Sequence, residues 1–203
     1  MSSEPVFFRP RFGRALTVAS ASLCAVGLVA TVADSGAPAL RYLPALVLPA
    51  VVVWALFGRP AVVVSDAGVE VRNVTRTVHL PWPAIQRIDT KYALTLYTAY
   101  GVYAAWAAPA PSRMQTLGAA PGDLRHLPES SYGPGGVRPG DLVGTASGDA
   151  AALIRRRWEE LRDAGHLEDA RLERERPLVR WHVLPALGVA ALVALTVLAL
   201  GTG

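Results

Sequence analysis

Hydrophobic residues form three long runs along the chain, at residues 15–33, 40–57 and 183–200. At a helical rise of about 1.5 Å per residue, runs of this length extend over roughly 27–29 Å, which matches the hydrocarbon core of a bilayer. The pattern therefore predicts three transmembrane helices. The first two form a hairpin at 15–57, and the third, with a short tail, occupies 183–203.

The first runs have two alternative interpretations. A cleaved signal peptide would also follow a basic segment such as 1–14, but the run at 15–33 is long for the apolar part of a signal, and no small-x-small cleavage site follows it. Cleavage there would leave the remaining topology unchanged. The second alternative is that the runs at 15–33 and 40–57 pack as a buried hairpin in a soluble core.

Arginine residues near the apolar runs predict the direction of insertion. They precede the first run, follow the second and precede the third: Arg9, Arg11, Arg14, Arg59, Arg171, Arg174, Arg176 and Arg180. No basic residue follows the third run. Because basic flanks stay on the cytoplasmic side, the N-terminal segment 1–14 and the region 58–180 are predicted to be cytoplasmic, with the C-terminus outside. This is the topology of a multi-pass protein of the bacterial inner membrane.

Composition agrees with a membrane protein. Hydrophobic residues make up 52% of the 203 positions, the net charge is +4, and Lys91 is the only lysine. The arginine-rich, alanine-rich composition suggests a high-GC bacterial genome, and the position of the arginines beside apolar runs argues against a nucleic-acid partner. Cys24 is the only cysteine, so no disulfide within the chain or cysteine-based metal cluster is possible.

Between the second and third runs, the pattern changes to short segments in which apolar and polar residues alternate. In "TRTVHLPWPAI", for example, Val78, Leu80 and Trp82 share one face. Tight turns separate these segments, and Gly68 allows the positive φ that a hairpin turn needs. The pattern predicts an antiparallel meander within 58–108, with six strands at 61–65, 69–73, 76–82, 84–92, 94–98 and 102–106.

A different pattern follows this β region. Residues 109–148 are dense in proline and glycine, which predicts a disordered loop. An amphipathic helix is predicted over 149–165, with Asp149 as its N-cap and Ile154, Trp158 and Leu161 on one face. A basic linker at 166–182 then leads to the third apolar run.

A meander closed by one amphipathic helix resembles the bacterial pleckstrin-homology (PH) domains, and more narrowly the actinobacterial membrane-attached branch of the low-molecular-weight protein antigen 6 type. The residues that carry the resemblance are "RPAVVVSDAGVEVRN", "RTVHLPWPAI", "AAWAAP" and "RRRWEELRDAGHLEDARLE". The resemblance implies a small β-barrel closed by the C-terminal helix. A complete PH barrel has seven strands, whereas the alternation predicts six.

The implied barrel has a predicted core and two predicted ends. Trp82 is expected to close one end, because an indole buries a large area, and Trp158 from the helix is expected to cover the opposite opening. The predicted core residues are Val78, Leu80, Trp82, Ile85, Ile154, Trp158 and Leu161.

No motif for catalysis, nucleotide binding or metal binding is present in the sequence. The four histidines are scattered, and Glu159 and Glu160 are adjacent on a helix, so they point in different directions. We therefore expect no enzyme activity, no catalytic residues, no cofactor and no metal site.

The sequence favours a non-enzymatic protein that presents a PH-like domain as an interaction or scaffold module. The expected partner is another membrane or envelope-associated protein, bound through an exposed sheet edge or the loop at 109–148. The alternative is a module that binds or senses lipid head groups through Arg59, Arg72, Arg76 and Lys91, although Asp66, Glu70 and Asp89 dilute the positive field. A weaker contact of these basic residues with anionic lipids is also expected.

Overall fold

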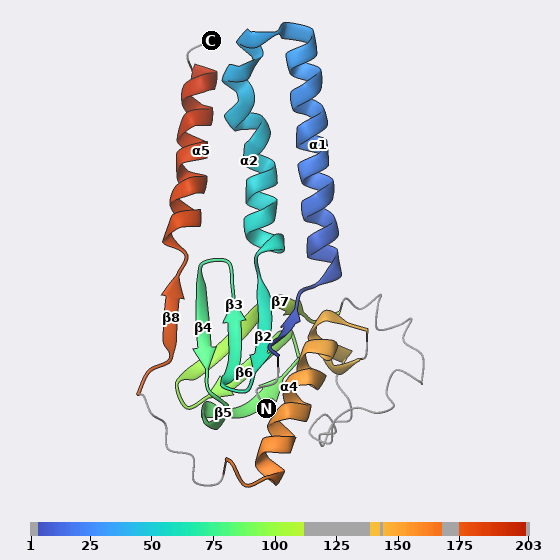
Figure 1. Cartoon of the computed structure of the whole chain (residues 1–203), viewed down its shortest axis with the longest axis vertical. Coiled ribbons are helices and arrows are strands. Elements are labelled where there is room, and N and C mark those ends of the chain that lie inside the picture. The colour runs from blue at the N-terminus through green and yellow to red at the C-terminus, as the bar shows by residue number, and fades with distance from the viewer. Residues whose placement is uncertain (1–3, 112–138, 143, 168–174, 202–203) are drawn as a thin grey trace. The chain divides into compact units, whose positions relative to one another are not determined.

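The computed structural model describes residues 4–111, 139–142, 144–167 and 175–201 (Figure 1). The chain divides into two compact units. A β-rich unit comprises Met1–Pro10 and Ala61–Arg180, and a helical unit comprises Arg11–Pro60 and Trp181–Gly203. Each unit is therefore built from two stretches of chain that are distant in sequence.

The helical unit contains the three predicted apolar helices. Its elements are α1 (Arg11–Ser35), the 3₁₀ helix η1 (Ala37–Tyr42), α2 (Leu43–Val53), the π-helical turn η2 (Trp54–Gly58) and α5 (Val183–Gly201). Three stretches are long and apolar enough to cross a membrane, namely Arg11–Asp34, Leu40–Gly58 and Val183–Gly201. No residue in the most apolar part of each stretch is buried, which contradicts the alternative of a hairpin inside a soluble core.

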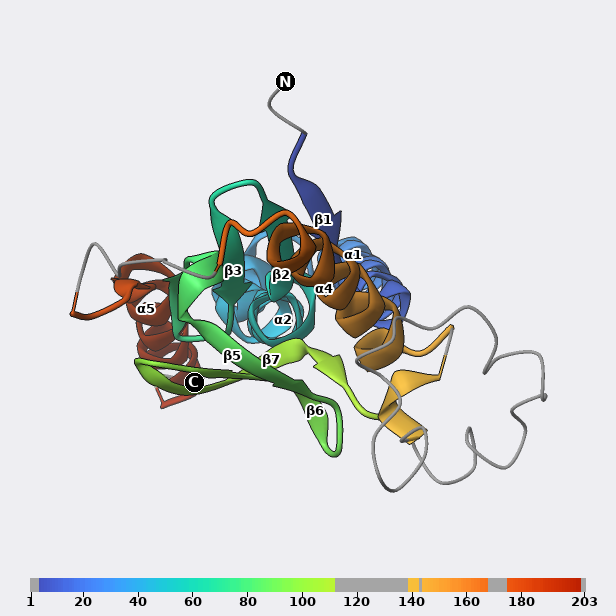
Figure 2. The same cartoon turned by 90° about the horizontal axis from the view of Figure 1, so that it is seen from below.

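The β-rich unit contains two antiparallel sheets. The first has the strand order β1-β2-β3-β4-β8, and the second has the order β5-β6-β7. The strands of the first sheet are β1 (Val6–Phe8), β2 (Ala61–Ser65), β3 (Gly68–Arg72), β4 (Arg76–Leu80) and β8 (Leu178–Trp181). The strands of the second sheet are β5 (Ile85–Asp89), β6 (Ala93–Thr98) and β7 (Gly101–Pro109). Figure 2 shows this sheet from below.

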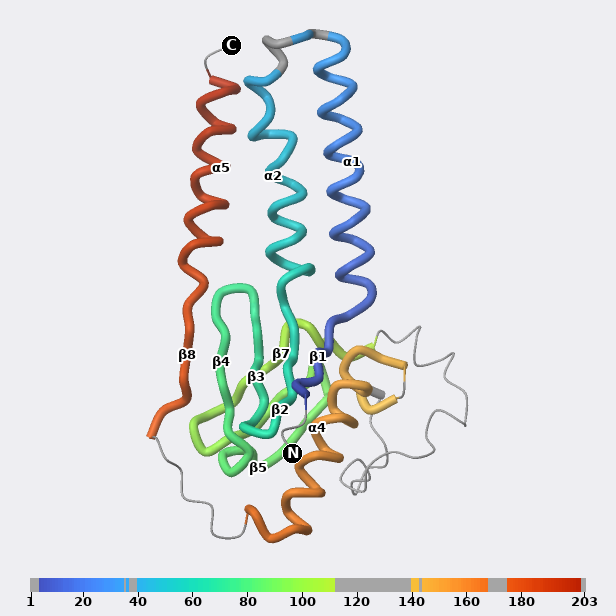
Figure 3. Tube along the Cα trace, viewed as in Figure 1, coloured from blue at the N-terminus to red at the C-terminus, as the bar shows by residue number. Residues whose placement is uncertain are grey.

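The six strands that alternation predicts correspond to β2–β7. Two further strands, β1 and β8, lie in segments for which the pattern predicts a membrane flank (1–14) and a linker (166–182). In the structure, β1 pairs with β2, and β8 lies beside β4. Figure 3 follows the chain from β1 into α1 and from β8 into α5. Both missed strands are short and directly adjoin an apolar helix.

The prediction of a barrel is wrong in one respect, because the two sheets do not close into a barrel within the described residues. Pro81 and Pro83 flank Trp82, and the chain there forms the 3₁₀ turn η3 (Trp82–Ala84). Proline lacks the N–H that a sheet ladder requires, so the strand ends and the chain passes into the second sheet. On β7, Ala104 O and Trp106 N bond to the side chain of Asn73, which follows β3.

The core lies between the sheets and the amphipathic helix α4 (Ala146–Asp163). Of the predicted core residues, Val78, Leu80, Trp82, Ile85 and Ile154 are buried, and Trp158 and Leu161 are partly buried against them. The indole N–H of Trp82 donates to Ser65 O at 2.9 Å, so the buried ring has its polar group satisfied.

The start of α4 differs from the prediction. The N-cap is Thr145, whose hydroxyl accepts a hydrogen bond from Gly148 N at 3.0 Å. Asp149 is not the N-cap but lies in the first turn, where its carboxylate accepts from Gly144 N at 2.8 Å. Threonine and aspartate are both good capping residues, so local sequence does not distinguish the two positions. Part of the predicted loop at 109–148 therefore belongs to the helix and its entry, while residues 112–138 lie outside the described residues.

Candidate functional site

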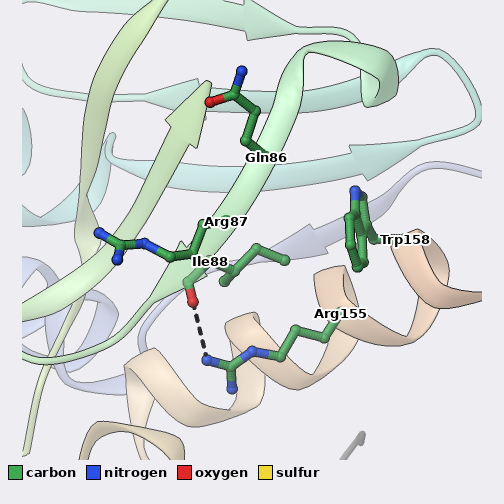
Figure 4. Close-up of a pocket in the computed structure, with 5 residues that line it drawn as sticks. All are labelled: Gln86, Arg87, Ile88, Arg155 and Trp158. Carbon is green, nitrogen blue, oxygen red and sulfur yellow. Dashed lines mark hydrogen bonds between the residues drawn. The ribbon is translucent and has the colours of Figure 1, made fainter. Parts of the chain in front are cut away.

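A small pocket lies in the β-rich unit where α4 passes the edge strand β5. Gln86, Arg87 and Ile88 of β5 line one side, and Arg155 and Trp158 of α4 line the other (Figure 4). The pocket volume is about 120 Å³. Sites for cofactors and drug-sized ligands usually measure about 300–1,000 Å³, so this pocket has room for one side chain or a small group.

Side chains of α4 donate hydrogen bonds to backbone carbonyls on this edge of the sheet. The indole N–H of Trp158 donates to Ile85 O at 3.2 Å, and Nη2 of Arg155 donates to Ile88 O at 3.3 Å. Both carbonyls belong to β5, which has a strand neighbour only in β6 among the described strands. Because these two acceptors are already used, a partner strand would have to displace α4 side chains in order to pair there. The free space at the site therefore suits a side chain better than an added strand.

Arg155 is fixed by a buried ion pair. Its side chain is 5% exposed, and Nη1 lies 2.5 Å from Oδ1 of Asp141, whose side chain is 2% exposed. The same carboxylate oxygen accepts from Thr90 Oγ1 at 2.7 Å. Asp141 belongs to the short 3₁₀ helix η6 (Pro139–Asp141), so one carboxylate joins η6, α4 and the end of β5. This arrangement holds one wall of the pocket rigid.

The rim of the pocket is polar and exposed. Arg87 and Gln86 are both at the exposed side of β5, and a bulge between Ile85 and Arg87 shifts the register of β5 against β6 at this point. The guanidinium of Arg87 stacks on the ring of Tyr97, with Cζ 3.9 Å from the ring centroid, and in Figure 4 it points away from Trp158. The Arg87 guanidinium therefore lies on the outer face of β5, directed away from the Trp158 side of the pocket.

Of the four basic residues predicted for lipid or partner binding, Arg72 and Arg76 lie one register position apart on neighbouring strands, and Lys91 lies in the other sheet. Arg59 belongs to the helical unit, where it stacks on Trp54. Arg72 lies on β3, 2.9 Å from Glu70, and Arg76 begins the neighbouring strand β4. Lys91 lies in the turn between β5 and β6, in the other sheet, with its ammonium over Tyr92. The set is therefore divided between two units and, within the β-rich unit, between two sheets.

A second set of charges joins α4 to the hairpin of β2 and β3. Arg157 lies 2.8 Å from Asp66 in the hairpin turn and 3.0 Å from Glu160. The hydrogen bonds to Glu160 and to Asp66 raise the pKa of Arg157 above its ordinary value. These residues are half-exposed or exposed, so they orient the helix more than they stabilise it.

Sequence reasoning misses the pocket, although part of the signal is present. The buried face of α4 includes Ala151, Ile154 and Arg155, with Trp158 on the same side at the spacing of a helix face. Arg155 is the middle of this face, yet it begins a run of three arginines, a pattern that predicts solvated charges. Asp141 gives no signal, since it lies in a segment without periodicity and its partner is 14 residues away.

Comparison with known families agrees with this architecture. The family profile described as Bacterial PH domain matches residues 59–164, which is just over half of the chain. The chain belongs to this family. The matched region contains β2–β7 and α4, and so includes both walls of the pocket, while β1 and β8 lie outside it. PH domains are generally non-catalytic modules. No curated protein and no solved structure matches the chain.

Proposed function

We propose that this chain is an integral protein of the bacterial inner membrane that presents its PH domain at the cytoplasmic face as a protein-interaction module. The observation that carries the proposal is the pocket between β5 and α4. Its volume of about 120 Å³ suits a single side chain, and its wall is fixed by the buried pair of Arg155 and Asp141. Anchor side chains of protein interfaces insert into well-packed pockets of their partner, and this pocket has room for one such side chain.

Strand pairing supports the proposed membrane topology. β1 precedes α1 and β2 follows η2, yet the two strands pair in register from Val6↔Val64 to Phe8↔Val62. A chain that leaves a sheet through α1 and returns to it after α2 crosses a bilayer an even number of times. The single helix α5 then carries the C-terminus to the other side. The arginine-rich flanks assign the sheet to the cytoplasm.

The chemistry of the pocket specifies the partner. Ile88 and Trp158 offer an apolar contact, Gln86 offers an amide at the rim, and Arg87 offers a positive charge beside it. The partner segment we propose inserts one apolar side chain between Ile88 and Trp158 and places an acidic residue near Arg87. Because the domain is held at the membrane, the partner is a membrane or envelope-associated protein.

Placement within the actinobacterial, low-molecular-weight protein antigen 6 branch is part of the same proposal. It is supported by the residues at 59–73 and 76–85 and by the combination of a PH domain with three apolar helices. The lipid-binding alternative for the PH domain is less favoured, because Arg72 is paired with Glu70 and Lys91 lies in a different sheet from Arg72 and Arg76.

Site-specific photo-crosslinking in native membranes tests the proposed function. A photoreactive amino acid replaces Gln86 at the rim of the pocket in the full-length protein, and the control carries it at Arg156, an exposed position of α4 outside the pocket lining. We expect a discrete crosslinked protein band from position 86 only. The band should weaken with Arg87→Glu but not with Arg156→Glu, which is a matched reversal of another exposed arginine. Equal crosslinking from both positions, or crosslinking to lipid alone, would contradict the proposal.

A further inference from the structure

An exposed tryptophan, Trp106 of β7, lies beside the turn between β3 and β4 in the β-rich unit. Its side chain is 54% exposed, and its backbone N–H donates to Oδ1 of Asn73 at 2.8 Å. Asn73 begins the β3–β4 turn, which is closed by a hydrogen bond from Asn73 N to Arg76 O at 2.9 Å and contains the exposed residue Thr75. The Trp106 residue and the turn are therefore neighbours on the surface of this unit.

A bulge in β7 brings Trp106 to this place. Thr95 pairs with Ala104 and Ala93 pairs with Pro109, so β7 contains three more residues than β6 over this stretch. The extra residues, which include Trp106, depart from the ladder with β6 and bend the strand. The backbone N–H of Trp106 bonds to the asparagine side chain at the turn. The position of the indole thus follows from the fold of the β-rich unit alone.

The register of the first sheet shows at which end of the sheet this turn lies. β1 ends at Phe8, three positions before α1, and β2 begins at Ala61, three positions after Gly58. Phe8 pairs with Val62, and Ala61 pairs with Arg72, the last residue of β3. The β3–β4 turn is therefore at the sheet end from which the chain leaves for α1 and to which it returns after η2. Three steps along the chain extend over at most about 11 Å, so this end cannot be far from either apolar helix.

The charges of the first sheet differ between its two ends. Arg72 and Arg76 flank the β3–β4 turn, and residues 73–75 include no acidic residue. Glu70 lies 2.9 Å from Arg72 and compensates one of these two charges. The turn at the opposite end, between β2 and β3, contains Asp66, which pairs with Arg157. The end with the exposed indole is therefore the one that an anionic lipid surface attracts.

We propose that the β3–β4 turn and the Trp106 indole insert into the head-group zone of an anionic phospholipid bilayer. This inference rests on the part of the proposed function in which the three apolar helices cross a bilayer, and it adds a second contact, made with lipid and not with protein. Tryptophan is enriched in the head-group zone because its ring is amphipathic. The contact is with the surface of the bilayer, so it needs no pocket for a single head group.

The accessibility of a nitroxide spin label in nanodiscs tests this contact. The full-length protein carries Cys24→Ala, which removes its only cysteine, and the label is attached to Thr75→Cys in the β3–β4 turn. The control is Ala67→Cys, an exposed position in the turn at the other end of β3. In nanodiscs of equal parts phosphatidylglycerol and phosphatidylcholine, collisions are measured with oxygen, which concentrates in lipid, and with a water-soluble nickel chelate.

We expect the ratio of oxygen to nickel collisions to be several-fold higher at position 75 than at position 67. Equal ratios would overturn the contact. Shielding of position 75 from both reagents would also overturn it, because that result indicates coverage by protein.

Two variants of Trp106 test the part of the indole. Trp106→Ser should lower the ratio at position 75 to near that at position 67, and Trp106→Phe, which keeps an apolar ring, should lower it less. Both variants retain the backbone N–H that bonds to Asn73, so the thermal unfolding temperature should stay near that of the wild type. An unchanged ratio in folded Trp106→Ser would overturn the inference.

Two arginine variants test the attraction to anionic lipid. Arg76→Gln should lower the ratio at position 75, and nanodiscs of phosphatidylcholine alone should lower it by a similar factor. Arg156→Gln removes the same charge from an exposed position of α4 and should leave the ratio unchanged. Equal losses for the two variants would show general charge attraction and would overturn the role of the turn.

A label in α5 separates a failure of this inference from a failure of the proposed function. Leu195→Cys lies near the middle of α5 and should collide mainly with oxygen. Dominant nickel collisions there would contradict the membrane topology and this inference together. Dominant oxygen collisions there, with equal ratios at positions 75 and 67, would overturn this inference alone. The crosslink from position 86 tests the protein partner independently.

Discussion

Arg155 and Asp141 form a buried ion pair that joins the core-facing side of α4 to the chain segment entering it. The two side chains are 5% and 2% exposed, and the pair is completed by Thr90, which donates to the same carboxylate oxygen. Two charges removed from water are tolerated when each has good partners, but either one alone is costly. α4 is therefore stable only when η6 packs at the end of β5, because that contact places Asp141 beside Arg155.

Asp141→Ala should destabilise the PH domain strongly. The substitution leaves the Arg155 guanidinium buried without its counter-charge, which lowers the free energy of unfolding by about 3–5 kcal/mol. Denaturant unfolding of the full-length protein in detergent, followed by tryptophan fluorescence, measures the change. Asp66→Ala removes the half-exposed partner of Arg157 and should cost about 1 kcal/mol or less. Similar costs for the two variants would show that burial of the pair has no energetic consequence.

Gly68→Ala tests how closely the β2–β3 hairpin approaches the end of β4. Gly68 has φ of +146°, and a Cβ there would lie 2.2 Å from Leu80 O. Gly101 has a similar φ of +125° but open space around its missing Cβ. Both alanine variants bear the backbone strain of about 1–3 kcal/mol, and only Gly68→Ala adds a clash with backbone. Unfolding midpoints should therefore fall further for Gly68→Ala, and equal shifts would contradict the close approach.

Much of the PH domain could be predicted from alternation, and the failures have physical causes. The segment 61–65, predicted as a strand, is β2, because its valines and flanking turn give a clear local signal. β1 and β8 have three and four residues beside apolar runs, and their identity as strands depends on pairing with β2 and β4. Pairing between segments that are distant in sequence cannot be predicted from the local alternation of apolar and polar residues.

The candidate site was less predictable than the fold. Ile154 and Trp158 can be found through helical periodicity, since they lie four positions apart on the core-facing side of α4. Arg155 interrupts that face with a charge whose burial depends on Asp141, and nothing local to Asp141 indicates this role. Closure of a barrel was expected from the family resemblance, but the side chain of Asn73 bonds to β7 where a further strand would have to pair.

Asn73→Ala should loosen the edge of β7. The Asn73 amide donates to Ala104 O at 2.8 Å and accepts from Trp106 N at 2.8 Å, so one side chain replaces part of a strand. Loss of these bonds should cost about 1–3 kcal/mol and speed amide exchange at Trp106. Hydrogen exchange with mass spectrometry measures the effect. Asn73→Asp keeps the acceptor, so protection at Trp106 should persist there, and unchanged exchange in Asn73→Ala would rule out this role.

Replacement of residues 112–138 by a short Gly/Ser linker should leave the PH domain folded. The described residues on either side of this segment both bond to the turn between β5 and β6. Ala110 N donates to Tyr92 O at 3.0 Å, and Asp141 accepts from Thr90. Because loop-closure entropy varies slowly with length, shortening the connection should change the free energy of unfolding by about 1 kcal/mol or less.

Denaturant unfolding and photo-crosslinking of the shortened protein separate two roles for this segment. If the pocket between β5 and α4 binds the partner, the crosslink from position 86 should survive the replacement, because Gln86, Ile88 and Trp158 are untouched. Loss of the crosslink with stability retained would transfer partner binding from the pocket to residues 112–138. Loss of stability by several kcal/mol would instead show that the contacts of Ala110 and Asp141 do not suffice to hold the two ends of the connection.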